Sequence, residues 1–235
     1  MKKLMIVFAM VLTMSFTTAV ALCVRVLSGA QAVAATDGGG MRIVLDAGHG
    51  GIDGGVTGKT TGVKESDLNL AITHCLKDAL EELGFEVTLT RKTEAGLYGT
   101  TAKGFKKRDM QKRKEIIEKV SPALVISIHQ NFYPTSVSRG GQVFYAKDDA
   151  RSLRLATALQ EQINALYFGE GVKGRKQAAG EFFMLDCTSH PAALVECGFL
   201  SNAKDERLLT NAQWQKKLAH TLAVGVLQYF SGAAT

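Results

Sequence analysis

Residues 123–128 (Ala-Leu-Val-Ile-Ser-Ile) form an apolar run directly after Pro122, and this run constrains the fold more than any other segment. A short apolar run of this kind is typical of a strand that is buried on both faces. Such strands belong to parallel sheets, because the crossover connections place helices over both sides of the sheet. The run therefore predicts an α/β fold in which this strand lies inside a covered sheet.

Strand and helix patterns alternate along the rest of the chain. Short apolar or alternating segments predict strands at residues 42–45, 85–90, 142–146, 182–185 and 192–195. Apolar residues at helical spacing predict helices from Ser66 or Asp67 to residue 83, over 107–120 and 149–168, and from Trp214 to Phe230. We therefore expect an α/β fold with a single domain, residues 41–232, built on a twisted, mostly parallel sheet with helices on both faces. In such sheets, ligands bind beyond the carboxyl ends of the strands.

The first 35 residues differ from the rest of the chain. Lys2 and Lys3 precede an apolar stretch at residues 4–24, and small residues follow at 30–35. This order is typical of a signal peptide, while the apolar stretch is also long enough for an uncleaved N-terminal membrane anchor. Both alternatives predict an exported, extracytoplasmic domain, free or tethered to the membrane through residues 4–24. Residues 36–40 are expected to be a short flexible linker.

The formal net charge of +6 does not indicate a nucleic-acid-binding protein. Half of this excess lies in the first 35 residues, which hold three basic and no acidic side chains. The glycine-rich turn at residues 48–58 resembles nucleotide-binding loops, but Asp53 stands where both known glycine patterns need glycine. We therefore expect no nucleic acid and no nucleotide as a ligand.

Three cysteines lie outside the first 35 residues: Cys75, Cys187 and Cys197. Their odd number and the lack of a C-x-x-C pair argue against a disulfide framework. Two alternatives remain open, namely a bond between Cys187 and Cys197 on adjacent strands, or three free thiols.

Polar side chains follow several of the predicted strands. His49 follows the first strand, His129 follows the buried run, and Glu196 follows residues 192–195, while Glu65 stands just before the first helix. If the glycine-rich turn folds over the sheet edge, these residues converge there. Two histidines and one carboxylate form a ligand set that leaves a fourth position on zinc for water. A further carboxylate beside that water can accept its proton during attack on a carbonyl.

Each residue also has a purely structural interpretation. A lone histidine after a strand is often a hydrogen-bonded loop residue, and Glu65 alone resembles an acidic side chain that stabilises a helix N-terminus. Glu196 is harder to explain in this way, because a carboxylate that follows an apolar strand is partly desolvated and needs a partner or a use. The three other histidines, at positions 74, 190 and 220, are expected to lie outside the site.

Four motifs occur in order along the chain: Leu-Asp-Ala-Gly-His-Gly-Gly at 45–51, Lys-Glu-Ser-Asp-Leu-Asn-Leu at 64–70, Ser-Ile-His-Gln-Asn at 127–131 and Val-Glu-Cys-Gly-Phe-Leu-Ser-Asn at 195–202. Together they resemble the motifs of zinc-dependent N-acetylmuramoyl-L-alanine amidases of the amidase-3 type. The resemblance covers residues 41–230 and implies that His49, Glu65 and His129 hold one zinc ion. It also implies that Glu196 is the catalytic carboxylate, and that the substrate is the amide between N-acetylmuramic acid and L-alanine in peptidoglycan.

Residues 99–113 resemble the same segment in a germination-related subgroup of this family. That subgroup acts on spore cortex, where its cleavage prepares muramic δ-lactam. Three other functions stay open: a vegetative cell-wall amidase, a zinc peptidase that cuts the stem peptide, and a non-catalytic wall-binding module. Whether the enzyme needs a protein activator as a partner also stays open. Asp46 and Asn131 are expected either to orient the ligands or to fix local turns. The seven basic residues at 103–114 either form a solvated helix face or contact anionic wall polymer or membrane.

Overall fold

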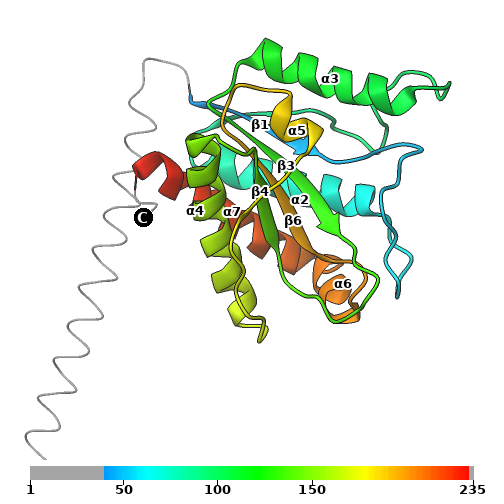
Figure 1. Cartoon of the computed structure of the whole chain (residues 1–235), viewed down its shortest axis with the longest axis vertical. Helices are drawn as coiled ribbons and strands as arrows, with labels where there is room; N and C mark the ends of the chain where they lie inside the picture. The colour runs from blue at the N-terminus through cyan, green and yellow to red at the C-terminus, as the bar shows by residue number, and fades with distance from the viewer. Residues whose placement is uncertain (1–39, 233–235) are drawn as a thin grey trace, which may run out of the picture.

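The computed structural model describes residues 40–232, so the predicted leader and most of the predicted linker lie outside the described range (Figure 1). Six strands and six helices follow one another along this range. They are β1 (Arg42–Ala47), α2 (Glu65–Glu82), β2 (Glu86–Leu89), α3 (Phe105–Val120), β3 (Leu124–Asn131), β4 (Gln142–Tyr145), α4 (Ala150–Phe168), β5 (Ala178–Ala179), α5 (Phe183–Asp186), β6 (Ala192–Phe199), α6 (Ala203–Leu209) and α7 (Ala212–Ser231).

The strands form one sheet in the order β2-β1-β3-β6-β4-β5. All neighbouring pairs are parallel except β4 and β6, which are antiparallel. The strand predicted from residues 123–128 is β3, and its first five residues are all buried. The predicted single α/β domain with a mostly parallel sheet is confirmed.

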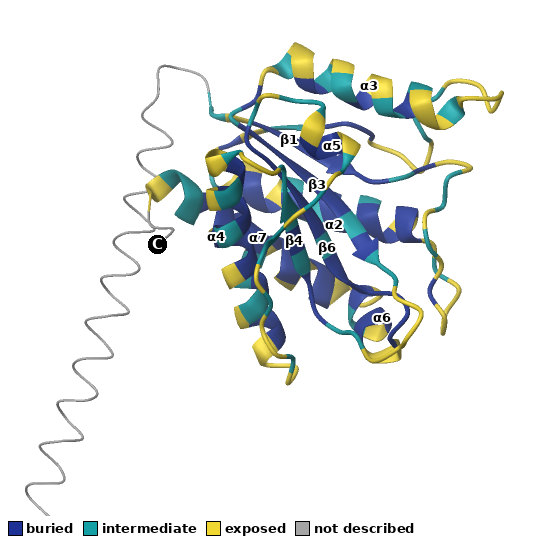
Figure 2. Cartoon of the chain, in the orientation of Figure 1, coloured by how far each residue is buried: buried dark blue, intermediate teal, exposed yellow. Residues whose placement is uncertain are grey.

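The two faces of the sheet are covered unequally (Figures 1 and 2). On one face, α2 and α4 pack against the sheet and α7 packs against both of these helices, and together they form the larger apolar core with Ile43, Ile126 and Val195. Only α3 and the one-turn helix α5 cover the other face, over a smaller cluster that includes Val44 and Leu194. The thin cover on this second face leaves room for a site between α3 and α5.

The predicted strand at residues 182–185 is wrong, because this segment begins the helix α5. A four-residue apolar run fits a strand or a buried helical turn equally well, and only its surroundings decide between them. Here the segment lies over the thinly covered face of the sheet, where α5 contacts β6 and α3. Met184 and Leu185 instead turn inward and pack in the smaller core cluster.

The predicted start of α2 also needs correction. Neither Ser66 nor Asp67 caps this helix, since α2 begins at Glu65 and Lys64 makes no side-chain capping bond. The backbone N–H groups of Glu65 and Ser66 donate instead to the carbonyls of Val56 and Gly54. The glycine-rich loop thus satisfies the first turn of the helix, and the Glu65 carboxylate is left for other contacts.

Cys75, Cys187 and Cys197 are free thiols. Cys197 is buried in the larger core, whereas Cys187 packs against the smaller cluster on the opposite face of the sheet. The two side chains are therefore separated by the sheet, which excludes the alternative of a bond between them. Within residues 40–232, none of the helices combines the length and the apolar character that crossing a membrane requires.

Candidate functional site

Strand alternation directs three polar side chains to the thinly covered face. Successive side chains on a strand point to opposite faces, so residues two apart share a face. Val44 and Leu194 lie in the smaller cluster on this face. Asp46, His129 and Glu196 therefore also point to it, each from a different strand. Pairing of the strands brings the last two together, because His129 and Glu196 are register partners on β3 and β6.

The loop between β1 and α2 supplies the other two predicted site residues. Its backbone turns back on itself through bridges between Gly50 and Asp53 and between Thr57 and Lys64. His49 has the left-handed φ of 62°, which a non-glycine residue rarely adopts. Gly48 must be glycine, because a Cβ there would collide with the ring of His129. The loop therefore packs directly on the second histidine.

The predicted ligands meet at one point. His49 Nε2 lies 3.3 Å from Glu65 Oε1, and His129 Nδ1 lies 3.0 Å from the same oxygen. Ligand atoms at about 2.0–2.1 Å from a tetrahedral ion lie about 3.3 Å from one another, so this spacing fits a metal. Among the described residues, these three are the only group of histidine, cysteine or acidic side chains with such a spacing.

Glu65 is fixed by donors from three segments. Its Oε2 accepts from the backbone N–H of Val56 at 3.0 Å, and its Oε1 accepts from the N–H of Gln130 at 3.1 Å. Asn69, one turn along α2, donates to Oε1 and also to the carbonyl of Gly48. Burial acts to raise the pKa of Glu65, but hydrogen bonds with His129 and His49 outweigh it and lower the pKa. Glu65 does lie in the first turn of α2, as the structural interpretation expects, but its carboxylate also contacts both histidines.

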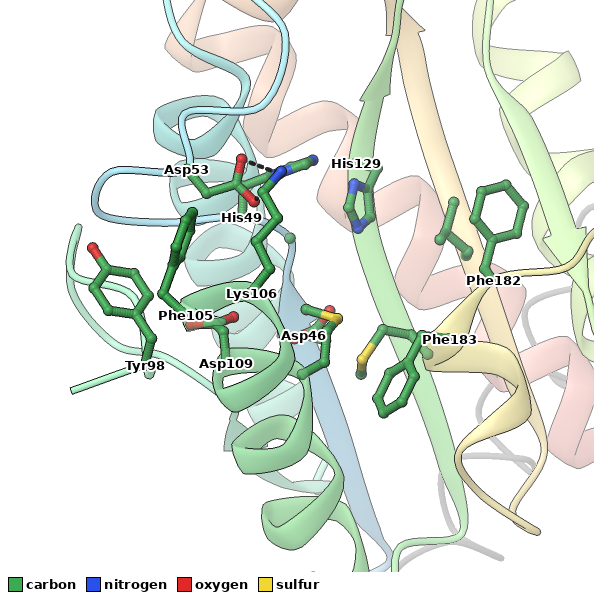
Figure 3. A pocket seen from close by; sticks show the side chains of 14 residues that line it. Asp46, His49, Asp53, Tyr98, Phe105, Lys106, Asp109, His129, Phe182 and Phe183 are labelled. Carbon is green, nitrogen blue, oxygen red and sulfur yellow. Dashed lines mark ion pairs between the residues drawn. The ribbon is translucent and has the colours of Figure 1, made fainter. Parts of the chain in front are cut away.

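Asp53 is a site residue that the sequence did not reveal. Its Oδ1 lies 3.2 Å from Nδ1 of His49, and its Oδ2 lies 3.4 Å from Nζ of Lys106 at the start of α3 (Figure 3). Burial acts to lower the pKa of His49, but its contacts with Glu65 and Asp53 outweigh it and raise the pKa. A carboxylate that holds one ring nitrogen leaves the other directed at the metal position. The only feature of the sequence that pointed to Asp53 was its position four residues after His49.

Glu196 lies next to this group without a partner of its own. Its Oε2 is buried and has no hydrogen-bond partner among residues 40–232. Burial raises the pKa of Glu196 to about 7, while the nearby His129 lowers it in part. A desolvated carboxylate with a pKa near neutrality is suited to accept and return a proton. The expectation that Glu196 would be desolvated is therefore met.

Two buried arginines hold the segment that carries His49. Arg113 of α3 donates to the carbonyls of Ala47 and His49, at 2.7 and 2.6 Å, and pairs with Asp46 at 2.6 Å. Arg91, two residues after the end of β2, donates to the carbonyls of Ala47 and Gly48. These charge-assisted bonds stabilise the strained backbone at His49.

Asp46 does not contact the histidine or Glu65 side chains. Its carboxylate accepts from Thr90, Ser127 and Arg113. Of the two predicted alternatives, Asp46 thus fixes the local backbone and acts on His49 only through Arg113. Asn131 lies at the end of β3, where its carbonyl accepts from the N–H of Leu200.

The basic segment at residues 103–114 is partly structural. Arg113 is fully buried, and Arg108 donates to loop carbonyls that include those of Tyr98 and Thr100. Lys112 and Lys114 form ion pairs with glutamates of the same helix. Arg108 and Arg113 thus stabilise the fold, and contact of the remaining lysines with anionic polymer or membrane stays a prediction.

Two neighbouring cavities lie beside the convergent residues and share part of their lining. The first, about 200 Å³, lies between α3 and α5, and the second, about 500 Å³, lies over Glu65 and Glu196. The residues that line both cavities are His49, Asp53, Lys106, His129, Phe182 and Leu194. Both cavities therefore meet where a metal ion would be held.

The chain is similar over most of its length to known N-acetylmuramoyl-L-alanine amidases. A germination-specific N-acetylmuramoyl-L-alanine amidase from Bacillus subtilis is 33% identical over 195 residues, which cover 82% of this chain and 81% of the relative. The N-acetylmuramoyl-L-alanine amidase AmiA of Escherichia coli is 28% identical, over 82% of this chain and 77% of its own length. The CwlD amidase of Clostridioides difficile, solved in complex with the GerS lipoprotein, has 36% identity and a TM-score of 0.77, over 82% of this chain and 99% of that chain.

A family model described as N-acetylmuramoyl-L-alanine amidase, Amidase_3, matches residues 43–228. This range spans the whole sheet and includes His49, Glu65, His129 and Glu196. The four motifs, the fold and the relatives all agree with this match. The chain therefore belongs to the amidase-3 family and is an N-acetylmuramoyl-L-alanine amidase.

Proposed function

We propose that this amidase is a zinc hydrolase that cleaves the amide between N-acetylmuramic acid and L-alanine in peptidoglycan. His49, Glu65 and His129 hold one zinc ion, and Glu196 is the catalytic carboxylate. The observation that carries the proposal is the convergence of two imidazole nitrogens on one oxygen of Glu65, with distances of 3.3 and 3.0 Å. Two nitrogens and one carboxylate oxygen form a typical catalytic zinc set with an open fourth position.

Each residue has a defined part in the hydrolysis. Bound zinc supplies Lewis acidity, which polarises a carbonyl and promotes ionisation of water. Glu196 accepts the proton of the attacking water and then donates it to the departing nitrogen of alanine. The acetylmuramic carboxylate and the free amino group of alanine are the products. Glu65 keeps its negative charge throughout, because its lowered pKa disfavours protonation at neutral pH.

Spore cortex is the proposed substrate, where cleavage prepares muramic δ-lactam. This proposal is supported by the germination-specific relative at 33% identity and by the resemblance of residues 99–113 to the cortex subgroup. Purified cortex and vegetative peptidoglycan, digested in parallel by the zinc-loaded protein, test it. Faster release of peptides from cortex is expected, and equal rates on both would favour a vegetative amidase.

A digest separates the amidase from a zinc peptidase. Mass spectrometry of muropeptides treated with the zinc-loaded protein should show intact stem peptides with a free alanine amino terminus and glycans that retain N-acetylmuramic acid. A peptidase would leave alanine attached to the muramic acid. The variant Glu196→Gln should bind zinc and release no peptide, and zinc binding without any cleavage by the unmodified protein would indicate a wall-binding module.

The chain is proposed to act outside the cytoplasm, on the cell wall or tethered to the outer face of the membrane. Residues 4–24 would provide the tether, and they lie outside the described residues. The CwlD relative was solved with a lipoprotein bound, which supports a protein partner here as well. The activity of the purified chain is measured first alone and then after addition of an extract of its host membranes. Activity that appears only with the extract would show that a partner is needed.

A further inference from the structure

The smaller cavity, between α3 and α5, has walls of aromatic and thioether side chains (Figure 3). Phe105 and Met110 of α3 form one wall, together with Tyr98 from the preceding loop. Phe183 and Met184 of α5 form the opposite wall. None of these five residues lines the larger cavity, so the two cavities differ in the chemistry of their walls.

The charged residues of this cavity are already satisfied by the protein. Asp46 accepts from Thr90, Ser127 and Arg113, and Asp109 accepts from Arg113 and from the N–H of Leu97. Lys106 and Asp53 pair with each other where the cavity meets the metal ligands. An occupant of the cavity therefore gains mainly from apolar contact, and a charged group would lose its hydration without compensation.

The larger cavity has the opposite character. It is lined by Glu65, Gln130, Asn131 and Glu196. Phe132 also lines it, and Nζ of Lys59 lies 5.3 Å from the centre of the Phe132 ring. The amide side chains of Gln130 and Asn131 can hydrogen-bond the backbone of a peptide, which the smaller cavity cannot do with its apolar walls.

The position of Glu196 decides which half of the substrate enters which cavity. Under the proposed function, Glu196 returns its proton to the nitrogen of alanine, so that nitrogen lies beside Glu196. Glu196 lines the larger cavity and not the smaller one. The alanine and the stem peptide therefore lie in the larger cavity, and the acyl half of the scissile amide extends past His49 and His129 toward the smaller cavity.

The geometry points to the cavity between α3 and α5 as the subsite for the N-acetylmuramoyl half of the substrate. This inference rests on the proposed function and names the specificity of the same site. The muramoyl half is uncharged when its carboxyl group is in the amide, and it carries the methyl groups of its lactyl and acetamido substituents. These methyl groups pack against Phe105 and Phe183, and the sugar presents its C–H face to the same rings.

The test uses the zinc-loaded protein with three variants. Phe105→Ala and Phe183→Ala each remove one ring from the smaller cavity. Phe183 is 45% exposed, so its replacement has little effect on folding. Phe132→Ala is the matched control, because Phe132 lines only the larger cavity. Thermal unfolding and bound zinc are measured for each variant, so that a folding defect is recognised.

Four substrates are used to distinguish the contribution of the muramoyl half from that of the stem peptide. The reference is N-acetylmuramoyl-L-alanine with a full stem peptide. Two trimmed substrates each lose one methyl group from the muramoyl half, through an N-formyl group in place of N-acetyl or a glycolic ether in place of the lactic ether. The fourth substrate keeps the muramoyl half and shortens the stem to alanine amide.

We expect at least one substrate with a trimmed muramoyl half to lose about tenfold in kcat/KM with the unmodified protein, because a methyl group in an apolar pocket has about this effect. The loss should shrink below about threefold in Phe105→Ala or Phe183→Ala. The effect of shortening the stem should stay unchanged in these variants and should change in Phe132→Ala.

Two results would overturn the subsite. Equal discrimination against the trimmed substrates in the unmodified protein and in both cavity variants would show that the muramoyl half lies elsewhere. Altered dependence on stem length in Phe105→Ala or Phe183→Ala would place the peptide in the smaller cavity. Failure of the zinc-loaded unmodified protein to cleave the reference substrate, both alone and with the extract of host membranes, would instead overturn the proposed function, and the subsite with it.

Discussion

Asp53 Oδ1 lies 3.2 Å from Nδ1 of His49, so the carboxylate of Asp53 orients the imidazole of His49. This contact holds the ring so that Nε2 lies on the side of Glu65, 3.3 Å from its Oε1, where a metal ion would be held. The pair lies within one loop, four residues apart, where the backbone turn at Gly50 brings the two side chains together. Asp53 is therefore part of the site, although it is not one of the three converging ligands.

Replacement of Asp53 by Asn should weaken zinc binding by about 10–100-fold, because the ring of His49 loses its orienting carboxylate. Competition with a chromogenic chelator measures the affinity. Asp78→Asn is the matched control, because the Asp78 side chain is 74% exposed on α2, and it should leave the affinity unchanged. Equal affinity in Asp53→Asn and in the unmodified protein would show that Asp53 does not support the ligand.

Glu196→Gln should lower kcat by about 10²–10⁴-fold while zinc remains bound, because the amide keeps the shape of the carboxylate and cannot accept the proton. Turnover of a soluble muramoyl-peptide, measured beside the zinc content of the same sample, checks this prediction. Near-normal turnover with a full zinc content would contradict the role of Glu196. Glu181→Gln, in the exposed segment before α5, serves as the control.

Zinc should raise the thermal stability of the chain. A ligand that binds only the folded state adds about 2.7 kcal/mol at one hundred times its dissociation constant. The melting temperature, recorded after chelation and after return of zinc, should therefore rise on return of the metal. His129→Ala should abolish this rise and the activity together, whereas His220→Ala, on the exposed side of α7, should keep both. A zinc-dependent rise that persists in His129→Ala would place the ion elsewhere.

Asp46 should make the folded state sensitive to acid. Burial acts to raise its pKa, but the charge of Arg113 and the hydrogen bonds from Ser127 and Thr90 outweigh it and lower the pKa from 3.8 to about 2. Since the folded pKa lies below the unfolded one, the contribution is present above the unfolded pKa and is lost as the pH falls toward about 2. The size of this contribution is about 2 kcal/mol.

The variant Asp46→Asn should lose about 3–5 kcal/mol at pH 7, because Arg113 then keeps a buried charge with one fewer partner. Its stability should also fall less steeply between pH 4 and about 2 than that of the unmodified protein. Urea unfolding of the metal-free protein across this range measures both effects. An identical pH dependence in the two proteins would show that Asp46 is not the titrating group.

The alternation of patterns along the chain was enough to predict an α/β domain, most of its strands and helices, and the four residues of the proposed centre. The continuous apolar run of β3 indicates by itself that this strand is buried on both faces. Each motif residue is also adjacent to a strand or helix with a clear pattern. His129 and Glu196 were expected beyond their strands. They lie within β3 and β6, because the pairing of these strands continues past the apolar runs.

Contacts between distant segments decided the rest. Whether residues 182–185 form a strand or a helix depended on their packing in the smaller core cluster, which no local pattern records. The burial of Arg113 under His49 joins residues 64 positions apart, and on its own helix this arginine looks like one more surface charge. The sequence by itself determined which chemical groups are present and on which elements they lie. Only the tertiary structure decided how they meet, because close packing and the satisfaction of buried charges are properties of the whole fold.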